Sequence, residues 1–264
     1  MAYSETRGED PLTDDVLTGQ YRIFQRKRGH RYSVDDVVTA WAASLARPRA
    51  TTYLDLGCGI GSVLLMVIHR LAPSVRAAGI EAQTVSHGLA RRNLDRNELS
   101  SRVQLIHGDF RDSRVRDALQ CRSFDLITGT PPYMPPGTSI PSPDSQRAYA
   151  RVEYRGGVEA YLAAAAPLLA PDGRVVVCGD ARTPARVDRG AQEAGLRAVL
   201  RQDVIPRDLR DPLFTVWTLG HRDHTDEFVH APPLIMRDQF GARTDFAQKL
   251  RPFFGLPENP HEEP

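Results

Sequence analysis

Tyr53-Leu-Asp55-Leu-Gly57-Cys58-Gly59-Ile60-Gly61 is an apolar run that ends in alternating glycines, and the apolar segment 62–69 follows it. This order predicts a buried strand, a tight turn and a helix. Glycines let a ligand approach the backbone closely, and the first turn of a helix offers N–H groups that have no partner in the helix. The spacing differs from the Gly-x-Gly-x-x-Gly of dinucleotide-binding folds, and Asp55 suits an ammonium group better than a pyrophosphate. The alternative is a tight turn that binds nothing.

On both sides of this stretch, strand and helix patterns alternate from residue 51 to residue 220. Strands are expected near 52–56, 76–81, 102–107, 123–129, 173–179, 197–204 and 213–219, and helices near 61–72, 83–97, 111–120, 157–170 and 184–194. Such alternation predicts an α/β domain whose parallel sheet is covered by helices on both faces. The last two strands have no helical pattern between them, so we expect them to form an antiparallel pair.

Shorter segments flank this domain. Residues 1–19 begin with a polar, acidic stretch and are expected to form a flexible tail. Residues 20–50 are expected to cap the domain with short edge strands and a helix, which Ser33 caps and which ends before Pro48. Residues 221–264 are expected to form a C-terminal extension. In it, a linker over 221–233 precedes a short strand near 234–236, a helix near 244–250 and a frayed acidic end.

Composition limits the class of protein. With 264 residues, of which 41% are hydrophobic, the chain can build one large domain or two small ones. A net charge of +1 argues against a protein that coats nucleic acid nonspecifically, but it permits a local basic face. The three cysteines include no Cys-x-x-Cys pair, so neither a disulfide framework nor a metal site is expected. No apolar run has the length of a membrane span and no signal-peptide pattern is present, so we expect a cytoplasmic protein.

Acidic residues stand at the ends of the next two predicted strands. Glu81 closes the second strand, at a separation from the glycine turn that suits a carboxylate accepting both ribose hydroxyls. Asp109 and Phe110 follow the third strand, where an acid beside an aromatic ring can bind an adenine amino group and pack on the base. Each acid alone is equally well explained as a helix N-cap or a solvated loop residue. Their succession at consecutive strand ends favours a nucleoside-binding site.

The fourth strand ends in the rigid tetrapeptide Thr130-Pro131-Pro132-Tyr133. Prolines donate no backbone hydrogen bond and restrict the chain on either side. The segment therefore offers carbonyl oxygens, a hydroxyl and an aromatic ring at the edge of the sheet where open α/β folds bind ligands. This inventory suits a flat group that carries an NH2, which the acceptors can bind and the ring can stack on. The alternative is a stiff loop without chemistry.

Together these motifs resemble those of class I S-adenosylmethionine-dependent methyltransferases, in which Pro-Pro-Tyr marks enzymes that methylate planar nitrogens. Further segments resemble the bacterial tRNA(Val) adenine-N6 methyltransferase family, across residues 20 to 255. They are Gln25, Tyr32-Ser33-Val34-Asp35-Asp36-Val37-Val38, Asp144-Ser-Gln146-Arg147-Ala-Tyr-Ala150-Arg151, Leu234-Ile-Met-Arg237-Asp238 and Phe253-Phe254. The resemblance implies a Rossmann-like fold, with a mostly parallel seven-stranded sheet in the order 3-2-1-4-5-7-6.

The resemblance also implies a role for each motif. The glycine turn with Asp55 would hold the methionine part of S-adenosylmethionine, Glu81 its ribose, and Asp109 with Phe110 its adenine. The full set of residues expected at the cofactor is Gln25, Tyr32, Ser33, Asp35, Asp55, Gly57, Cys58, Gly59, Gly61, Glu81, Ala82, Gly108, Asp109, Phe110 and Thr130. The residues expected to be catalytic are Thr130, Pro131, Pro132 and Tyr133. The family has Asn where this chain has Thr130, a change that keeps amino methylation plausible and puts adenine itself in question.

Two basic segments indicate a nucleic-acid partner. Arg147, Arg151 and Arg155 share one face if that segment is helical, and five cations lie between Arg22 and Arg31. We expect these faces to flank the pocket and to grip tRNA or another RNA, although a solvated arginine face explains them equally well. The residues expected to bind substrate are Tyr133, Arg147, Arg151, Arg28 and Arg31. No membrane partner is expected, and the protein would be a monomer or a homodimer.

Three functions remain open at this point. The favoured one is an S-adenosylmethionine-dependent N-methyltransferase of an exocyclic amino group, adenine N6 of tRNA. The second is a methyltransferase of a protein glutamine amide or of a small molecule, since release-factor methyltransferases also carry Pro-Pro-Tyr. The third is a cofactor-binding module without activity, which Thr130 in place of Asn would explain.

Overall fold

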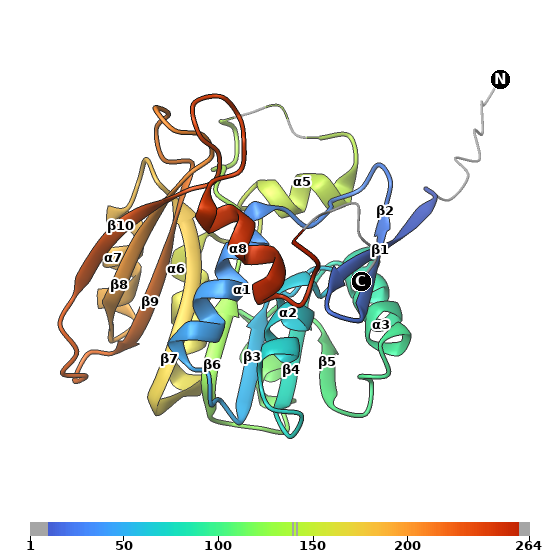
Figure 1. Ribbon diagram of the computed structural model, residues 1–264. Coiled ribbons are helices and arrows are strands. Elements are labelled where there is room, and N and C mark those ends of the chain that lie inside the picture. Colours follow the sequence, from blue (N-terminus) through green and yellow to red (C-terminus); the bar gives the residue numbers. More distant parts are fainter. Residues whose placement is uncertain (1–9, 139, 141, 259–264) are drawn as a thin grey trace.

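The computed structural model describes residues 10–138, 140 and 142–258, and an eight-stranded mixed sheet runs through its centre (Figure 1). The strands are β3 (Thr52–Leu56), β4 (Arg76–Glu81), β5 (Val103–His107), β6 (Phe124–Gly129), β7 (Leu169–Asp180), β8 (Leu196–Ile205), β9 (Phe214–His221) and β10 (Val229–Ile235). Their order across the sheet is β10-β8-β9-β7-β6-β3-β4-β5. The strands from β5 to β7 are parallel, β9 is antiparallel to β7 and β8, and β10 is parallel to β8.

Helices cover both faces of this sheet. They are α1 (Val34–Ala46), α2 (Ser62–Arg70), α3 (Thr84–Arg96), α4 (Ser113–Asp117), α5 (Ser145–Arg151), α6 (Val158–Ala165), α7 (Ala185–Glu193) and α8 (Asp245–Phe253), with a 3-10 turn at Ala166–Leu168. In Figure 1, α1, α2 and α8 lie in front of the sheet, and α6 and α7 lie behind it. Side chains alternate between two cores as the strand period of two requires, so Val176 and Cys178 pack on the α1 side, and Val175 and Val177 on the α6 side.

The expected fold class is confirmed, with one strand more than expected. Without β10, the sheet has the order 3-2-1-4-5-7-6, and the last two of these strands are antiparallel as expected. The prediction of a linker over 221–233 was wrong for residues 229–233, because β10 begins at Val229. Two adjacent prolines, Pro232 and Pro233, hid this strand in the sequence. They are tolerated because β10 is an edge strand, and its pairing with β8 shifts register between Ala231 and Leu234.

The N-terminal segment is more ordered than expected. Residues 12–18, which we expected in a flexible tail, form strand β1 (Leu12–Thr18), and it pairs in antiparallel fashion with β2 (Tyr21–Arg26). The hairpin packs against the C-terminal extension, since the Thr18 hydroxyl and the Gly19 N–H both donate to the Phe254 carbonyl, at 2.8 and 2.6 Å. This contact between distant parts of the sequence cannot be seen in local patterns. Residues 1–9 of the expected tail and 259–264 of the expected frayed end lie outside the described part.

Helix α1 begins as its sequence predicts. The Ser33 N–H donates to Asp36 Oδ2 at 2.8 Å, which forms half of a capping box, and the helix ends at Ala46, ahead of Pro48. The helix expected over 111–120 is shorter and covers only Ser113–Asp117. Across the described residues, no helix has both the length and the apolar character needed to cross a membrane.

Candidate active site

The glycine turn after β3 forms the base of a cavity. Gly57, Gly59 and Gly61 all have positive φ angles, of 62°, 57° and 88°, which side chains disfavour. A Cβ on Gly57 would lie 2.4 Å from the Tyr161 hydroxyl, so this position also has no room for a larger residue. A Cβ on Gly59 would meet nothing within 4 Å, because this residue faces open space. The turn therefore offers bare backbone to a ligand, as the nucleoside site expected from the sequence requires.

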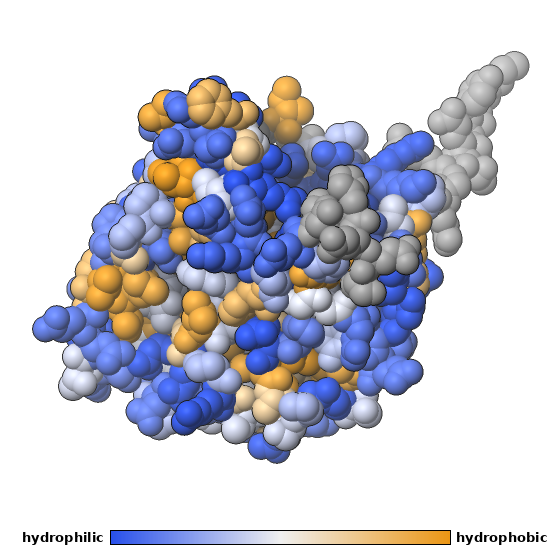
Figure 2. All heavy atoms as spheres, viewed as in Figure 1, coloured by the Kyte–Doolittle hydropathy of each residue, from blue (hydrophilic) through white to orange (hydrophobic). Residues whose placement is uncertain are grey.

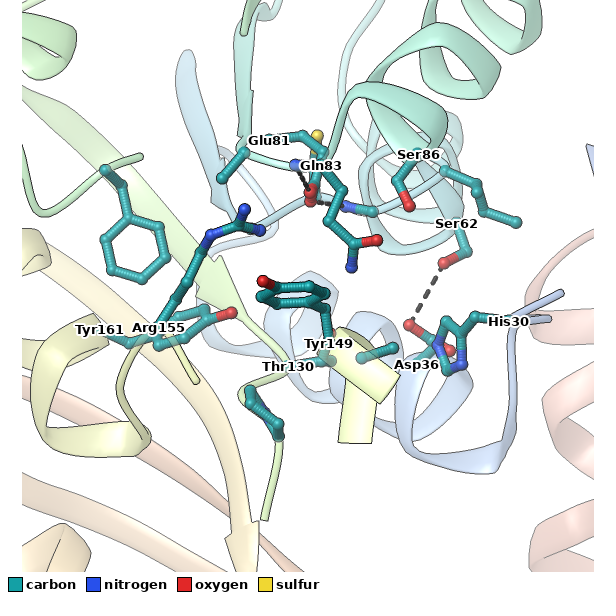
Figure 3. Close-up of a pocket in the computed structure, with 18 of the residues that line it drawn as sticks. His30, Asp36, Ser62, Glu81, Gln83, Ser86, Thr130, Tyr149, Arg155 and Tyr161 are labelled. Atoms are coloured by element: carbon teal, nitrogen blue, oxygen red, sulfur yellow. Dashed lines mark hydrogen bonds between the residues drawn. The ribbon is translucent and has the colours of Figure 1, made fainter. Parts of the chain in front are cut away.

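The cavity above this turn collects residues from several strand ends (Figure 3). Ten of its lining residues were expected at the cofactor or the catalytic centre: Tyr32, Gly57, Cys58, Gly59, Glu81, Ala82, Asp109, Phe110, Thr130 and Pro132. The other lining residues were not among those expected at the cofactor or the catalytic centre: His30, Asp36, Ile60, Ser62, Gln83, Ser86, Tyr149, Ala150, Arg155, Gly156 and Tyr161. We call this space the cofactor cavity.

Glu81 holds the glycine turn from the neighbouring strand. One oxygen, Oε2, accepts the Gly59 N–H at 2.9 Å, and Oε1 accepts the Gln83 N–H at 2.6 Å. Burial raises the pKa of the Glu81 carboxyl, and these two N–H groups oppose that rise. Each carboxylate oxygen has a second lone pair, so Glu81 can still accept a hydroxyl from the cavity.

The residues after β5 line the opposite end of the cofactor cavity. The Asp109 carboxylate accepts two bonds from the Arg111 guanidinium, at 2.6 and 3.0 Å, and this bonding lowers the Asp109 pKa. Phe110 is 6% exposed, and its ring meets that of Tyr161 edge-on, with centroids 4.5 Å apart. An ionised acid beside an aromatic wall is the arrangement that the sequence predicted for an adenine site.

Asp36 is a buried carboxyl that the sequence did not single out. Ser62 Oγ donates to Asp36 Oδ1 at 3.2 Å, while Oδ2 accepts the Ser33 N–H (Figure 3). Burial, with Asp35 as the next cause, raises the pKa of Asp36 to about 8. The sequence shows two adjacent acids, Asp35 and Asp36, in the first turn of the helix. Only the direction of the helix decides that Asp36 is the one that points inward.

A second, wider cavity adjoins the first. It has a volume of about 590 Å³ and is lined by all four residues of the predicted catalytic tetrapeptide. Five residues line both cavities: His30, Asp36, Thr130, Pro132 and Ala150. We call the second space the acceptor cavity, because Thr130 forms part of the wall between the two. Tyr133 lines the acceptor cavity and is held there, with its hydroxyl oxygen 3.1 Å from Asp35 Oδ2 and 2.9 Å from Cys178 Sγ.

The mouth of the acceptor cavity is basic. Its lining includes Lys27, Arg28, Arg31, Arg147 and Arg151, and the four arginines among them were expected to bind substrate. Helix α5 carries two of these arginines, and the buried Gln146 holds the helix in place. Gln146 Oε1 accepts the His30 N–H at 3.2 Å, and its Nε2 donates to Ser86 at 3.1 Å.

Arg155 does not lie where the sequence placed it. The three arginines would share a face only if 147–155 were helical, but α5 ends at Arg151, so Arg155 does not share the face of the other two. Its guanidinium instead stacks over the Tyr149 ring, 4.4 Å from the centroid, and lines the cofactor cavity. The chain turns there because Gly156 has a φ of 87°.

Tyr149 and Arg155 restrict the cofactor cavity. The ring of Tyr149 lies in the middle of the view in Figure 3, beneath Gln83 and between Thr130 and Arg155. The remaining free volume is about 100 Å³, whereas small-molecule sites have roughly 300 to 1,000 Å³. A ligand the size of a nucleoside needs more room than this, and Tyr149 and Arg155 are two of the side chains that occupy the space.

Several expected cofactor residues do not line the cofactor cavity. Ser33 and Asp35 line the acceptor cavity instead. Gln25 is fully buried and bonds Asp15 and the Tyr32 N–H, so its part is to hold the N-terminal segment. Gly108 packs on a neighbour, as a Cβ there would lie 2.7 Å from Val115. Gly61 caps α2 behind the cavity wall.

Asp55 also lies behind the wall. It is 2% exposed, and its Oδ1 accepts the Thr128 hydroxyl at 2.7 Å. Burial raises the pKa of Asp55 to about 7, and the charge of Glu81 adds to this rise. Asp55 therefore does not line the cavity, and it can act on a ligand there only through its charge.

The buried carboxyl of Asp36 makes stability depend on pH. Its pKa is about 8 in the folded chain and about 3.9 in an unfolded one. The folded protein therefore binds more protons in this window, and its free energy of unfolding falls as the pH rises. We expect the variant Asp36→Asn to lose less stability than the wild type between pH 5 and pH 8, as measured by denaturant unfolding. The control is Asp117→Asn, at an exposed position. An identical pH dependence of stability in Asp36→Asn and the wild type would contradict the raised pKa of Asp36.

Comparisons with known proteins identify relatives of this chain. The family model "Methyltransferase small domain" matches residues 31–140. The tRNA1(Val) (adenine(37)-N6)-methyltransferase of Porphyromonas gingivalis is 33% identical over 62% of this chain and 64% of its own length, so the match spans less than two thirds of that relative. The enzyme of the same name from Yersinia pestis is 31% identical over 64% of this chain and 68% of its own.

Two further matches show the breadth of the similarity. The release factor glutamine methyltransferase of Caulobacter vibrioides is 35% identical over 39% of this chain and 32% of its own. Among solved structures, a predicted O-methyltransferase from Agrobacterium tumefaciens superposes with a TM-score of 0.63 at 21% identity, covering 85% of this chain and 98% of that one. The chain belongs to the class I S-adenosylmethionine-dependent methyltransferases, in the family that includes the tRNA1(Val) (adenine(37)-N6)-methyltransferases.

Proposed function

We propose that this protein transfers the methyl group of S-adenosylmethionine to an exocyclic amino group, adenine N6 of a tRNA. The observation that carries the proposal is the shared wall of the two cavities, where Thr130 and Pro132 face both spaces. An amino group held at Thr130 would lie next to a methyl donor in the cofactor cavity. Bringing two reactants together in this way supplies most of the rate in a direct displacement.

The cofactor cavity has chemistry that fits S-adenosylmethionine. The open space at Gly59 leaves room for close approach to the backbone, and Glu81 can accept ribose hydroxyls. Asp109 and the ring of Phe110 can bind an adenine. When bound, the cofactor supplies a methyl group on a positively charged sulfur, which makes that carbon electrophilic.

The acceptor side has groups that can prepare an amine. An exocyclic amine is a weak nucleophile because its lone pair is conjugated with the ring. Acceptors at Thr130 Oγ1 and the Pro131 carbonyl would bind its hydrogens and favour a pyramidal nitrogen. Thr130 and the Pro131 carbonyl would hold the nitrogen toward the methyl group that the cofactor supplies, and the nitrogen's surplus proton would pass to water. The anchored ring of Tyr133 would stack on the base, as in enzymes that flip a base into a pocket.

An RNA substrate is supported by charge and by relatives. Five cations line the mouth of the acceptor cavity, and the Porphyromonas and Yersinia relatives are named for tRNA. A location in the cytoplasm, with tRNA, belongs to the same proposal. A protein glutamine amide is the second candidate, because the Caulobacter relative is named for it.

Transfer of labelled methyl from S-adenosylmethionine to total tRNA and to total protein separates these candidates. We expect label in tRNA, recovered as N6-methyladenosine after nucleoside analysis. Thr130→Val should lower kcat by up to roughly 100-fold, because the amine loses its acceptor and its position. Thr130→Asn should retain activity. In Thr130→Val the affinity for S-adenosylhomocysteine should fall far less than kcat, because Thr130 is one of many residues that line the cofactor cavity. Label in protein alone would reject the RNA substrate, and no label in either would reject both acceptors.

Gly59 tests the cofactor cavity directly. Gly59→Ala places a methyl group in the cavity at a left-handed residue, where an L side chain costs roughly 1–2 kcal/mol. The strain lowers the stability of the protein with or without ligand, whereas the methyl group takes space that the ligand needs. We therefore expect the affinity for S-adenosylhomocysteine to fall by about tenfold or more in calorimetry, about 1.4 kcal/mol or more. Gly88→Ala is the matched control, because its Cβ also meets open space but its φ is not positive. It should bind normally and be slightly more stable, and equal affinity in both variants would contradict the assignment.

The basic mouth should make RNA binding depend on salt. For single-stranded RNA, each neutralised phosphate contributes about 0.7 to the slope of log affinity against log salt. The double variant Arg147→Gln and Arg151→Gln should therefore bind RNA more weakly and reduce the slope by about 1.4. The control is Arg114→Gln with Arg122→Gln, two exposed arginines outside both cavities. An unchanged slope in the first variant would remove these two arginines from the RNA contact.

A further inference from the structure

Two loops next to the acceptor cavity form a joined structure. One covers residues 206–213, between β8 and β9, and the other covers 236–244, between β10 and α8. The Asp208 N–H donates to the Arg237 carbonyl at 2.8 Å, and the Met236 N–H donates to the Ile205 carbonyl at 2.9 Å. We call these loops the loop pair. Because each loop is tied to the other, the pair has a defined shape.

The tips of the loop pair are apolar and exposed. Leu209 is 82% exposed and has a φ of 64°, and Phe240 is 86% exposed. A left-handed conformation costs a leucine roughly 1–2 kcal/mol, so the backbone around it must hold it there. Phe240 is also held in place, since its N–H and that of Ala242 both donate to Asp238 Oδ1 at 2.9 Å. Figure 2 shows apolar residues protruding over these loops at the top of the view, bordered by hydrophilic ones.

The loop pair stands between two hollows. Leu213, at the end of the first loop, lines the acceptor cavity. Pro206, Met236 and Arg243, at the roots of the two loops, line a groove of about 610 Å³. The groove and the acceptor cavity share Arg31, Ser33 and Val34. A chain that enters the acceptor cavity can therefore continue into the groove, past the roots of the loop pair.

Cations surround the apolar tips. Arg207, Arg210, Arg237 and Arg243 are all exposed. Two acids in the loops accept backbone N–H groups. Asp208 accepts that of Leu209, and Asp238 accepts those of Phe240 and Ala242. An exposed aromatic ring with arginines around it matches a strand that has bases and phosphates.

We propose that the loop pair binds unpaired nucleotides next to the target base, a proposal that rests on the proposed function. The Phe240 ring stacks on the face of a neighbouring base, and Arg237 and Arg243 contact its phosphates. A base presents its face to a side chain only when it is unpaired, so the site selects a single-stranded loop. The loop pair thus helps to choose the substrate, whereas the acceptor cavity receives the reacting base.

The test compares Phe240→Ala with Phe228→Ala in RNA binding. Phe228 is 50% exposed and precedes β10, at the strand end away from the loop pair, so it is a matched control. We expect Phe240→Ala to raise the Kd for an RNA stem with an unpaired loop by about 5- to 100-fold, as loss of one stacked base does. The Kd for a fully paired RNA, the affinity for S-adenosylhomocysteine and the salt slope should be unchanged. Arg237→Gln with Arg243→Gln should instead reduce the salt slope by about 1.4.

The outcomes separate this inference from the proposed function. If the wild type binds and methylates RNA while Phe240→Ala binds the unpaired loop as tightly, the loop pair is not a nucleotide site and the proposed function stands. An equal loss with paired RNA would reject the selection of unpaired nucleotides. If Phe240→Ala leaves RNA binding intact and changes self-association in sedimentation, the tips join two copies of the chain. If the wild type neither binds nor methylates RNA, both proposals fail.

Discussion

The hydrogen bond from the Gly59 N–H to the Glu81 carboxylate joins the two strand ends on which the site depends. Glu81 ends β4, and Gly59 lies in the turn that follows β3, so one buried acid fixes the position of one strand's turn against its neighbour. A carboxylate buried to this degree must be bonded, and two backbone N–H groups satisfy it. The glycine turn can then keep its left-handed residues and leave its backbone bare toward the cavity.

The sequence predicted the fold well where local patterns reflect the layers of the sheet. Strand segments such as Val175–Cys178 in β7 are buried on both faces, so their residues appear as an unbroken apolar run. Patterns were misleading where distant contacts decide the structure. The edge strand β10 contains two prolines that local rules exclude from a sheet interior, and β1 owes its order to pairing with β2 and to contact with Phe254. Neither contact is visible in a short window of sequence.

The same distinction applies to the site. Residues at strand ends, such as Glu81 and Asp109, could be predicted because the ends of parallel strands meet at one edge of the sheet. Tyr149, Arg155 and His30 come from segments whose position depends on packing, here on the bonds that Gln146 makes to His30 and Ser86. The inward orientation of the Asp36 side chain depends on the direction of α1, which the sequence does not show. Gln25 and Asp55 show the opposite case, in which the motif is present but the side chain faces the core.

The two cavities differ in the sign of their charge, and this difference explains how one site could hold two unlike ligands. Asp36 and Glu81 line the cofactor side and Asp55 lies behind its wall; burial raises the pKa of all three, and a neighbouring carboxyl adds to the rise at Asp36 and Asp55. Such carboxyls ionise more readily beside a cation, so this side favours a ligand that carries positive charge, as S-adenosylmethionine does on its sulfur and its amino group. The acceptor mouth is basic and favours a polyanion. Asp36 faces both spaces, so the change of sign falls at the wall where the proposed transfer takes place.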